Sequence, residues 1–279
     1  MKDNSLTGAD IKDIRSRDIK DGSIRLRDLN TEVRKAIASG NVPVSGSSIG
    51  APGANGTNGA PGAAGQSGRD ATSSSGNWGV QSRNVLGSPD IGLRGGPANP
   101  PLGSGSLKFL VGSGSEKAAY GNEQDFFGQP VSGLTDVGFR VYTTGENAAL
   151  GSPNMPSILF EVDPNLNPAT TATNFSSLVF VPNNSASNGW SPYIDATQAT
   201  SGSWFMTGAA GTATGCNLTT TCSFALMQSR LADGGDAATI LTLGVTKGRD
   251  FAWQGAIDGL RINSQVFDFE SNGVTAGIA

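Results

Sequence analysis

Residues 157–163 read Ser-Ile-Leu-Phe-Glu-Val-Asp, and Pro164 ends the run. The alternate positions Ile158, Phe160 and Val162 are apolar, and this period of two predicts a β-strand with one buried face. Many short strands joined by Gly, Pro and Asn predict a mainly β fold, an antiparallel β-sandwich of the jelly-roll type, over residues 77–272. The same alternation of apolar residues recurs elsewhere in this region, in residues 139–143, 178–181, 241–246, 260–263 and 267–270.

The rest of this region offers one helical segment. Within residues 222–231, Phe224, Met227 and Leu231 fall on one helical stripe. Residues 208–215 are rich in Gly, Ala and Thr but lack the Lys-Ser/Thr ending of a phosphate-binding loop, so we expect a flexible surface loop there. We expect the sandwich to close at residue 272, with residues 273–279 as a tail.

Glycine recurs at every third position between residues 50 and 70. Three polyproline-II chains wound together leave no room for a Cβ at their axis, so this period predicts a collagen-like triple-helical stalk and a homotrimer. The alternative is a flexible Gly/Ala/Asn linker. The periodic positions are Gly50, Gly53, Gly56, Gly59, Gly62, Gly65 and Gly68.

Residues 1–40 contain a shorter repeat. Segments 6–11, 14–19 and 24–29 each have an aliphatic residue, three variable residues, Asp and another aliphatic residue. Stacking, or pairing with the same segment of sister chains, would cover the aliphatic row; the alternative is an amphipathic helix with chance similarity. A short helix is expected at 31–38, and linkers at 41–49 and 71–76.

Two parts of the chain resemble known families. The Gly-x-y stretch is similar to bacterial collagen-like proteins, and residues 4–30 look like the repeats of secreted actinobacterial surface proteins, where such repeats can precede a collagen-like stretch. Residues 253–270 resemble the closing strands of jelly-roll modules of the laminin-G and carbohydrate-binding kind. The family usually begins with an export signal, whereas Met1-Lys2 here leads straight into polar residues. From the resemblance we expect an extracellular or cell-surface protein; the alternative is a virion, which would explain the missing signal.

Composition excludes several functions. The chain of 279 residues has no histidine and two cysteines, which removes Ser-His-Asp and Cys-His catalysis and His-containing zinc sites. Residues 71–279 carry 9 Lys/Arg and 15 Asp/Glu, so nothing there resembles a nucleic-acid footprint. No run of 18 apolar residues exists, so no membrane insertion is expected.

Cys216 and Cys222 are separated by five polar or turn-prone residues. This spacing can bring two Cα atoms to disulfide distance, and we favour a disulfide over two free thiols. A disulfide implies an oxidising, extracellular setting.

Carboxylates supply the candidate metal ligands, with calcium as the one cofactor left open. Asp233 and Asp236 flank two glycines on a loop, where calcium or a plain turn is expected. The jelly-roll resemblance adds Asp258 and Glu270 as calcium candidates. Glu161 and Asp163 share one strand face, which favours a solvated face over a calcium site or the two carboxylates that glycosidases place across a sugar.

Aromatic residues near Asn/Gly/Ser-rich loops are the candidate ligand contacts: Trp190, Tyr193 and Trp204. Exposed aromatics can stack on sugar rings or anchor a protein, although buried packing is the usual role. Trp78 and Trp253 are expected in the core or at its rim.

These observations predict a non-enzymatic structural or adhesive fibre, a collagen-stalked homotrimer whose β-sandwich heads contact a glycan or a surface protein. The alternatives are a bacteriophage tail or head fibre that recognises host glycan and, ranked lower, a carbohydrate-active enzyme. Multivalency would be the mechanism, because three heads on one stalk raise avidity without new contacts.

Overall fold

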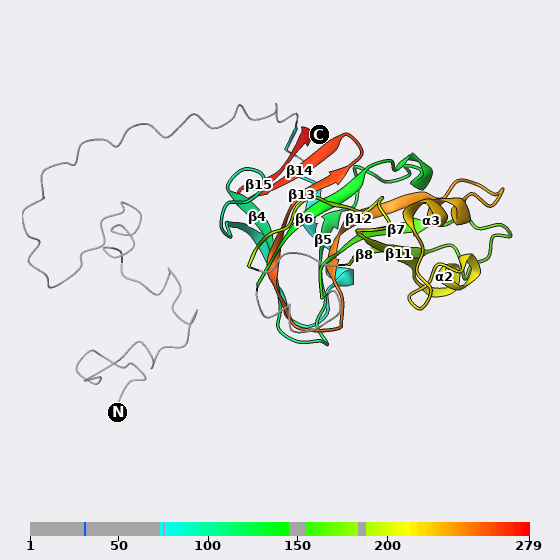
Figure 1. The fold of residues 1–279 in the computed structure, drawn as a ribbon, viewed down its shortest axis with the longest axis horizontal. Helices are drawn as coiled ribbons and strands as arrows, with labels where there is room; N and C mark the ends of the chain where they lie inside the picture. The colour runs from blue at the N-terminus through cyan, green and yellow to red at the C-terminus, as the bar shows by residue number, and fades with distance from the viewer. Residues whose placement is uncertain (1–30, 32–72, 75, 145–153, 184–187) are drawn as a thin grey trace, which may run out of the picture. The chain divides into compact units, whose positions relative to one another are not determined.

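The structure is a computed structural model that describes residues 31, 73–74, 76–144, 154–183 and 188–279 (Figure 1). Apart from Thr31, the predicted repeats and helix of residues 1–40, the linker at 41–49 and the Gly-x-y stretch at 50–70 lie outside the described residues. From Ser73 onward the described chain is mainly β and antiparallel, as the alternating pattern predicted.

The described strands form two sheets (Figure 1). The nine-stranded sheet has the order β1-β15-β14-β13-β4-β3, and β6 pairs with β13 and carries β9 and β10. The six-stranded sheet has the order β11-β8-β7-β12-β5-β2. The nine strands of the first sheet are β1 (Ser73–Ser74), β3 (Asp90–Gly95), β4 (Gly105–Val111), β6 (Val137–Thr143), β9 (Gly189–Trp190), β10 (Ile194–Asp195), β13 (Trp253–Ile262), β14 (Gln265–Glu270) and β15 (Gly273–Ile278). The six of the second are β2 (Trp78–Val80), β5 (Ala118–Asn122), β7 (Ser157–Asp163), β8 (Ser176–Pro182), β11 (Gly202–Met206) and β12 (Thr239–Lys247).

The two sheets share one hydrophobic core. Ile158, Phe160 and Val162 of β7 are fully buried, which confirms the face that alternation assigned to them. Leu159 and Glu161 on the opposite face are also buried, so the expectation of a single buried face was wrong. Trp78 of the six-stranded sheet contacts Phe269 of the nine-stranded sheet, with ring centroids 5.4 Å apart. Each such buried side chain contributes about 1.5–3 kcal/mol relative to exposure, so the facing rows of aromatic and aliphatic residues hold the sheets together.

Strand β13 has two partners in succession along one of its sides. Residues 253–257 pair with β4, residues 260–262 pair with β14, and β6 pairs along the opposite side. The change of partner falls at Asp258 and Gly259, where the register with β6 also shifts. Gly259 has a φ of +58°, a left-handed conformation that favours glycine. Before this junction, β13 lies between β6 and β4.

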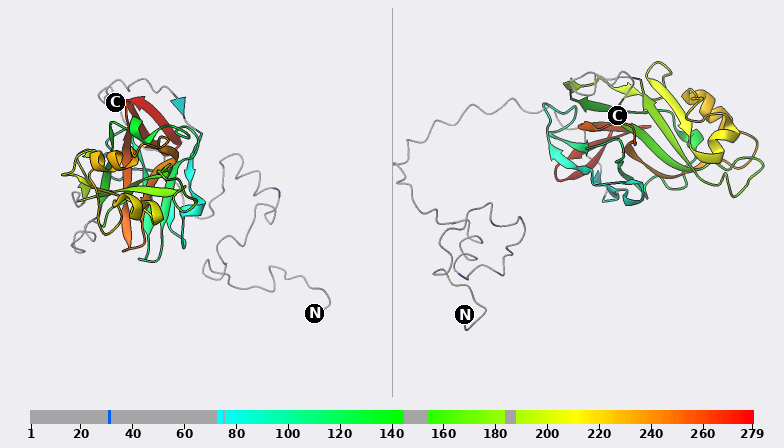
Figure 2. Two further views of the ribbon diagram at one scale, coloured as in Figure 1. Left: turned by 90° about the vertical axis from the view of Figure 1, so that its right-hand side faces the viewer. Right: turned by 90° about the horizontal axis from the view of Figure 1, so that it is seen from below.

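Two helices lie on the side of the two sheets that is farthest from β14 and β15 (Figures 1 and 2). They are α2 (Gly208–Thr214) and α3 (Phe224–Leu231), and the 3-10 turns are η3 (Ser82–Asn84) and η4 (Val131–Gly133). Helix α3 confirms the stripe predicted in residues 222–231. Helix α2 corrects the predicted loop at 208–215: a Cβ at Gly211 would lie 2.1 Å from the carbonyl oxygen of Met206, so glycine here permits close packing.

Two boundaries of the predicted sandwich were wrong. Residues 273–279 are not a tail, because β15 pairs with β14 along its length and buries Val274 and Ala276. Within the predicted linker at 71–76, Ser73 and Ser74 form β1 and pair with β15. The chain therefore enters the sandwich beside the strand that ends it.

Candidate functional site

A groove of about 170 Å³ lies on the outer face of the nine-stranded sheet. Tyr142 of β6, Gln254 of β13, Lys108 of β4 and Arg94 of β3 contribute side chains to it, and residues 95–97 form one wall. Along β4, Lys108 alternates with the fully buried Leu107 and Phe109. The period of two in each strand thus turns its polar side chains toward the groove while its apolar ones fill the core.

Trp190 lies beside this groove, on the strand next to Tyr142. Its strand pairs with β6 so that Trp190 is opposite Tyr142, and the two rings meet edge to face with centroids 5.7 Å apart. The Trp190 Nε1–H donates a hydrogen bond of 3.0 Å to the carbonyl oxygen of Pro97. Trp190, a predicted ligand contact, therefore fixes both Tyr142 and the wall at 95–97.

The groove carries a net positive charge. Asp90 accepts a hydrogen bond of 2.8 Å from Lys108, and its other carboxylate oxygen lies 3.5 Å from Arg94. The Lys108 ammonium lowers the pKa of Asp90, which keeps this carboxylate ionised at neutral pH. Two cations against one anion leave one positive charge.

The other two predicted ligand contacts lie outside the groove. Trp204 is fully buried and donates to the carbonyl oxygen of Ala196 at 2.7 Å, so it packs in the core, the usual role of such a ring, and is not an exposed ligand contact. Tyr193 lies under the guanidinium groups of Arg140 and Arg261, at 5.6 and 5.8 Å from its ring centroid. Burial and the Asp136 carboxylate, which accepts from its hydroxyl, raise the pKa of Tyr193.

The structure gives Asp258 and Glu270 a role in holding the loop at 96–104. Asp258 is fully buried and accepts hydrogen bonds from the backbone N–H groups of Leu102, at 2.9 Å, and Phe269, at 3.3 Å. Glu270 accepts from the N–H groups of Ser104 and Gly105. Burial acts to raise the pKa of Glu270, but these donors lower it overall.

Asp258 and its neighbour Asp268 have raised pKa values. Burial raises the pKa of Asp258 to about 7, although backbone N–H donors, including that of Gly259, act to lower it. Burial, together with the charge of Glu270, raises the pKa of Asp268 to about 6. Both groups therefore titrate between pH 5 and pH 8.

The remaining carboxylate candidates lie elsewhere. Asp233 accepts from the backbone N–H groups of Asn167, at 2.7 Å, and Gly235, at 3.2 Å, while Asp236 is exposed. In the part of the chain that the structure describes, no three His, Cys, Asp or Glu side chains form a group suited to a metal ion. Calcium at Asp233, Asp236, Asp258 or Glu270 stays a prediction.

Glu161 corrects the expectation of a solvated carboxylate face. Its side chain is 5% exposed and accepts hydrogen bonds from Asn84 at 2.8 Å, Thr242 at 2.8 Å and Arg83. Burial acts to raise the pKa of Glu161, but these donors lower it overall. Asp163 accepts from the N–H of Asn165 at 3.1 Å. Glu161 thus fastens η3 to the six-stranded sheet.

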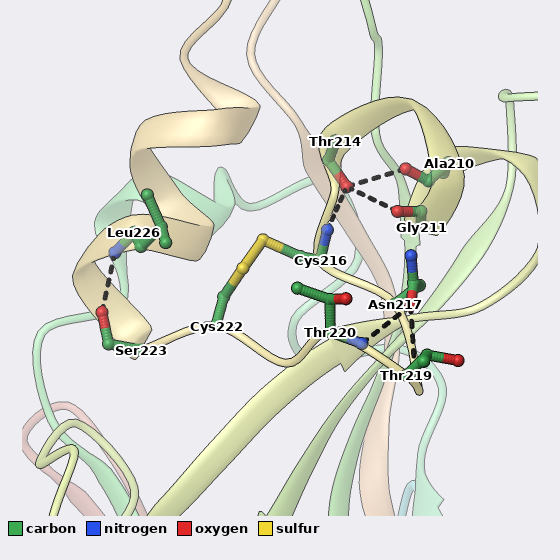
Figure 3. Close-up of a disulfide and its surroundings, with 10 residues drawn as sticks. All are labelled: Ala210, Gly211, Thr214, Cys216, Asn217, Thr219, Thr220, Cys222, Ser223 and Leu226. Carbon is green, nitrogen blue, oxygen red and sulfur yellow. Dashed lines mark hydrogen bonds between the residues drawn. A yellow bond between two sulfur atoms is a disulfide. The ribbon is translucent and has the colours of Figure 1, made fainter.

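A disulfide joins Cys216 and Cys222, the pairing that their spacing indicated (Figure 3). Cys222 pairs with Trp204 of β11, and the Cys216 carbonyl accepts from Met206. Ser223 follows directly and caps α3, accepting from the N–H of Leu226 at 3.2 Å. The bond thus ties the segment after α2 to the start of α3.

In comparisons with known proteins, no family model and no curated protein matches this chain. Within the described residues, no helix combines the length and apolar character needed to cross a membrane.

The residues that the sequence did not single out are Arg94, Lys108, Tyr142 and Gln254. Tyr142 lies in the predicted strand 139–143, between the buried Val141 and Thr143, so its outward position followed from the alternation. The meeting of four strands at one groove depends on pairing between segments more than 100 residues apart, which no local pattern reveals.

We expect the disulfide to stabilise the sandwich by about 2 kcal/mol, the loop-entropy value for so short a closed loop. The double substitution C216A/C222A should lower the free energy of unfolding by this amount in urea denaturation. A reducing agent should destabilise the unsubstituted protein similarly and leave C216A/C222A unaffected. Two reactive thiols in the native, unreduced protein would contradict the bridge.

The free energy of unfolding should fall as pH rises from 5 to 8. Asp258 and Asp268 have ordinary pKa values near 3.8 when unfolded, so in this window the folded state binds more protons and stability is lost as pH rises through about 7. Histidine, which would titrate in the same window, is absent. The loss should be on the order of a few kcal/mol, measured by urea unfolding at several pH values.

The matched variants for this measurement are Asp258→Asn and Asp236→Asn. Asp258→Asn should flatten most of the pH dependence, whereas Asp236→Asn changes an exposed carboxylate and should leave it intact. An unchanged slope in Asp258→Asn would show that other groups carry the effect.

Proposed function

We propose that this chain is a non-enzymatic structural or adhesive fibre protein, a collagen-stalked homotrimer whose jelly-roll heads bind saccharides at a surface. The observation that carries the proposal is the groove lined by Tyr142, Arg94, Lys108 and Gln254, with Trp190 packed edge to face against the Tyr142 ring. An aromatic face beside several hydrogen-bonding side chains suits a pyranose, which has apolar C–H faces and a rim of hydroxyl groups.

The position of the groove supports binding without rearrangement. Arg94, Lys108, Tyr142 and Gln254 belong to four adjacent strands of one sheet, so the hydrogen-bonded ladder fixes their spacing. Trp190 adds a further constraint through its hydrogen bond to Pro97. A preformed groove loses little conformational entropy on binding.

The trimer is supported by the sequence of the proposed stalk. Seven glycines repeat in strict period three, the requirement of a triple helix. Three heads on one stalk make the second and third contacts intramolecular, so weak individual sites give strong attachment. The disulfide is consistent with the proposed extracellular or cell-surface location, or with the alternative of a virion fibre.

The full chain should be a trimer in solution. Light scattering at micromolar concentration should give about three times the 28.4 kDa mass of one chain. Gly59→Asp places a side chain at a periodic glycine and should lower the trimer's melting temperature, because the axis has no room for a Cβ. Asn58→Asp adds the same side chain at the preceding, non-glycine position and serves as the control. A monomeric unsubstituted chain would remove the stalk from the proposal.

A glycan array probed with the full chain tests the head. Removing the ring in Tyr142→Ala should weaken binding of any captured saccharide by about tenfold or more, whereas Tyr142→Phe should retain it. If the array captures no saccharide with the unsubstituted protein, the saccharide-binding part of the proposal is wrong and a purely structural fibre remains.

A further inference from the structure

We infer that the groove selects saccharides that carry an anionic substituent, a carboxylate or a sulfate, and that this group binds at Arg94 and Lys108. The inference rests on the proposed function, because it assigns a ligand class to the same groove. It is argued from the arrangement of charges and donors on four neighbouring strands.

A continuous cross-strand row connects the aromatic and cationic parts of the groove. Trp190 is opposite Tyr142, Tyr142 is opposite Ala256, Ala256 is opposite Lys108, and Lys108 is opposite Gly92. Neighbouring strands are about 4.8 Å apart, so Tyr142 and Lys108 are separated by roughly two strand spacings, about 10 Å. A sugar ring stacked on Tyr142 therefore places its substituents within reach of the Lys108 ammonium.

Gly92 brings Arg94 into the same row. A Cβ at Gly92 would lie 2.7 Å from the Arg94 guanidinium, which shows that this guanidinium folds back over the glycine. Any larger side chain at this position would displace it. The groove thus holds two cationic groups, one point-like and one planar, beside a single aromatic face.

Both cations keep free donors. The Arg94 side chain is 56% exposed, and its described contacts are a 2.9 Å hydrogen bond to the Leu93 carbonyl oxygen and the 3.5 Å ion pair with Asp90. The Lys108 side chain is 34% exposed and donates to Asp90. Arginine has five N–H donors and lysine three, so most remain available to an anion. Asp90 orients the two cations and neutralises one of them.

The two cations of the groove lie on a part of the chain whose overall charge is negative. Residues 71–279 have a net charge of −6, which repels anionic ligands in general. A net positive groove on such a background gives a local attraction for one anionic group, whose strength falls as salt screens it.

Binding of three probes to the full chain by isothermal titration calorimetry tests the inference. The probes are trigalacturonate, its fully methyl-esterified form and a sulfated galactotriose. We expect trigalacturonate or the sulfated sugar to bind on the order of tenfold more tightly than the neutral ester, and the advantage to shrink at high salt. The tighter of the two charged probes identifies the preferred anion.

Substitutions locate the effect. Arg94→Gln should cost about tenfold for the charged probe and little for the neutral ester, and Gly92→Ala should reproduce the loss by displacing Arg94. Arg249→Gln removes an exposed cation outside the groove and should change the binding of neither probe.

Equal binding of charged and neutral probes overturns the inference while the proposed function stands. Failure of all three probes, with an array that captures no other saccharide, overturns the inference together with the saccharide-binding part of the proposed function.

Discussion

The carboxylate of Asp258 satisfies backbone donors at the junction where β13 changes partner from β4 to β14. A strand that passes from one neighbour to another leaves N–H groups without ladder acceptors, and a buried unpaired donor costs about 1–3 kcal/mol. Asp258 accepts from Leu102, which precedes β4, and from Phe269 on β14. The nine-stranded sheet therefore stays continuous across the junction, and its inner face packs as one surface against the six-stranded sheet.

Asp258 and Glu270 shape the groove because they hold the loop that forms its wall. Residues 96–104 leave β3 and return to β4, and this loop is attached at three places: to Trp190 through Pro97, to Asp258 through Leu102, and to Glu270 through Ser104. Its first residues form the groove wall. The raised pKa of Asp258 records the cost of burying one of these attachments. The buried carboxylate thus fixes the wall beside Tyr142 but lowers the free energy of unfolding, and this loss develops over the pH range in which Asp258 ionises.

Local pattern predicted the strands that combine a row of alternating apolar residues with clear turn signals. Strand β7 was expected at residues 157–163 and is observed there, because apolar side chains alternate and a proline follows. Strand β15 was missed because two of its six residues are glycine and one is alanine, which disfavour strands, and it is ordered by pairing with β14. Helix α2 was missed for a related reason, since Gly211 is a poor helix former that tertiary packing requires. The sequence left Trp204 open between a ligand contact and core packing, because a neighbouring Gly/Ser-rich loop does not indicate which face of β11 the ring occupies.

The candidate site was predictable only in part, because it is formed by pairing between strands that are distant in the sequence. Trp190 stood out as an aromatic near a loop, but its partner Tyr142 acquires meaning only when β9 pairs with β6. Lys108 and Arg94 are ordinary surface cations in the sequence, and they become neighbours of that ring because β13 joins β6 to β4 and β4 pairs with β3.

The absence of a side chain at glycine has two separate uses in this chain. In the Gly-x-y stretch its missing side chain would permit three chains to meet, and at Gly92 the same absence lets one guanidinium fold across a strand. In the proposed function, chain assembly and ligand selection would depend on the same steric property at two places in one sequence.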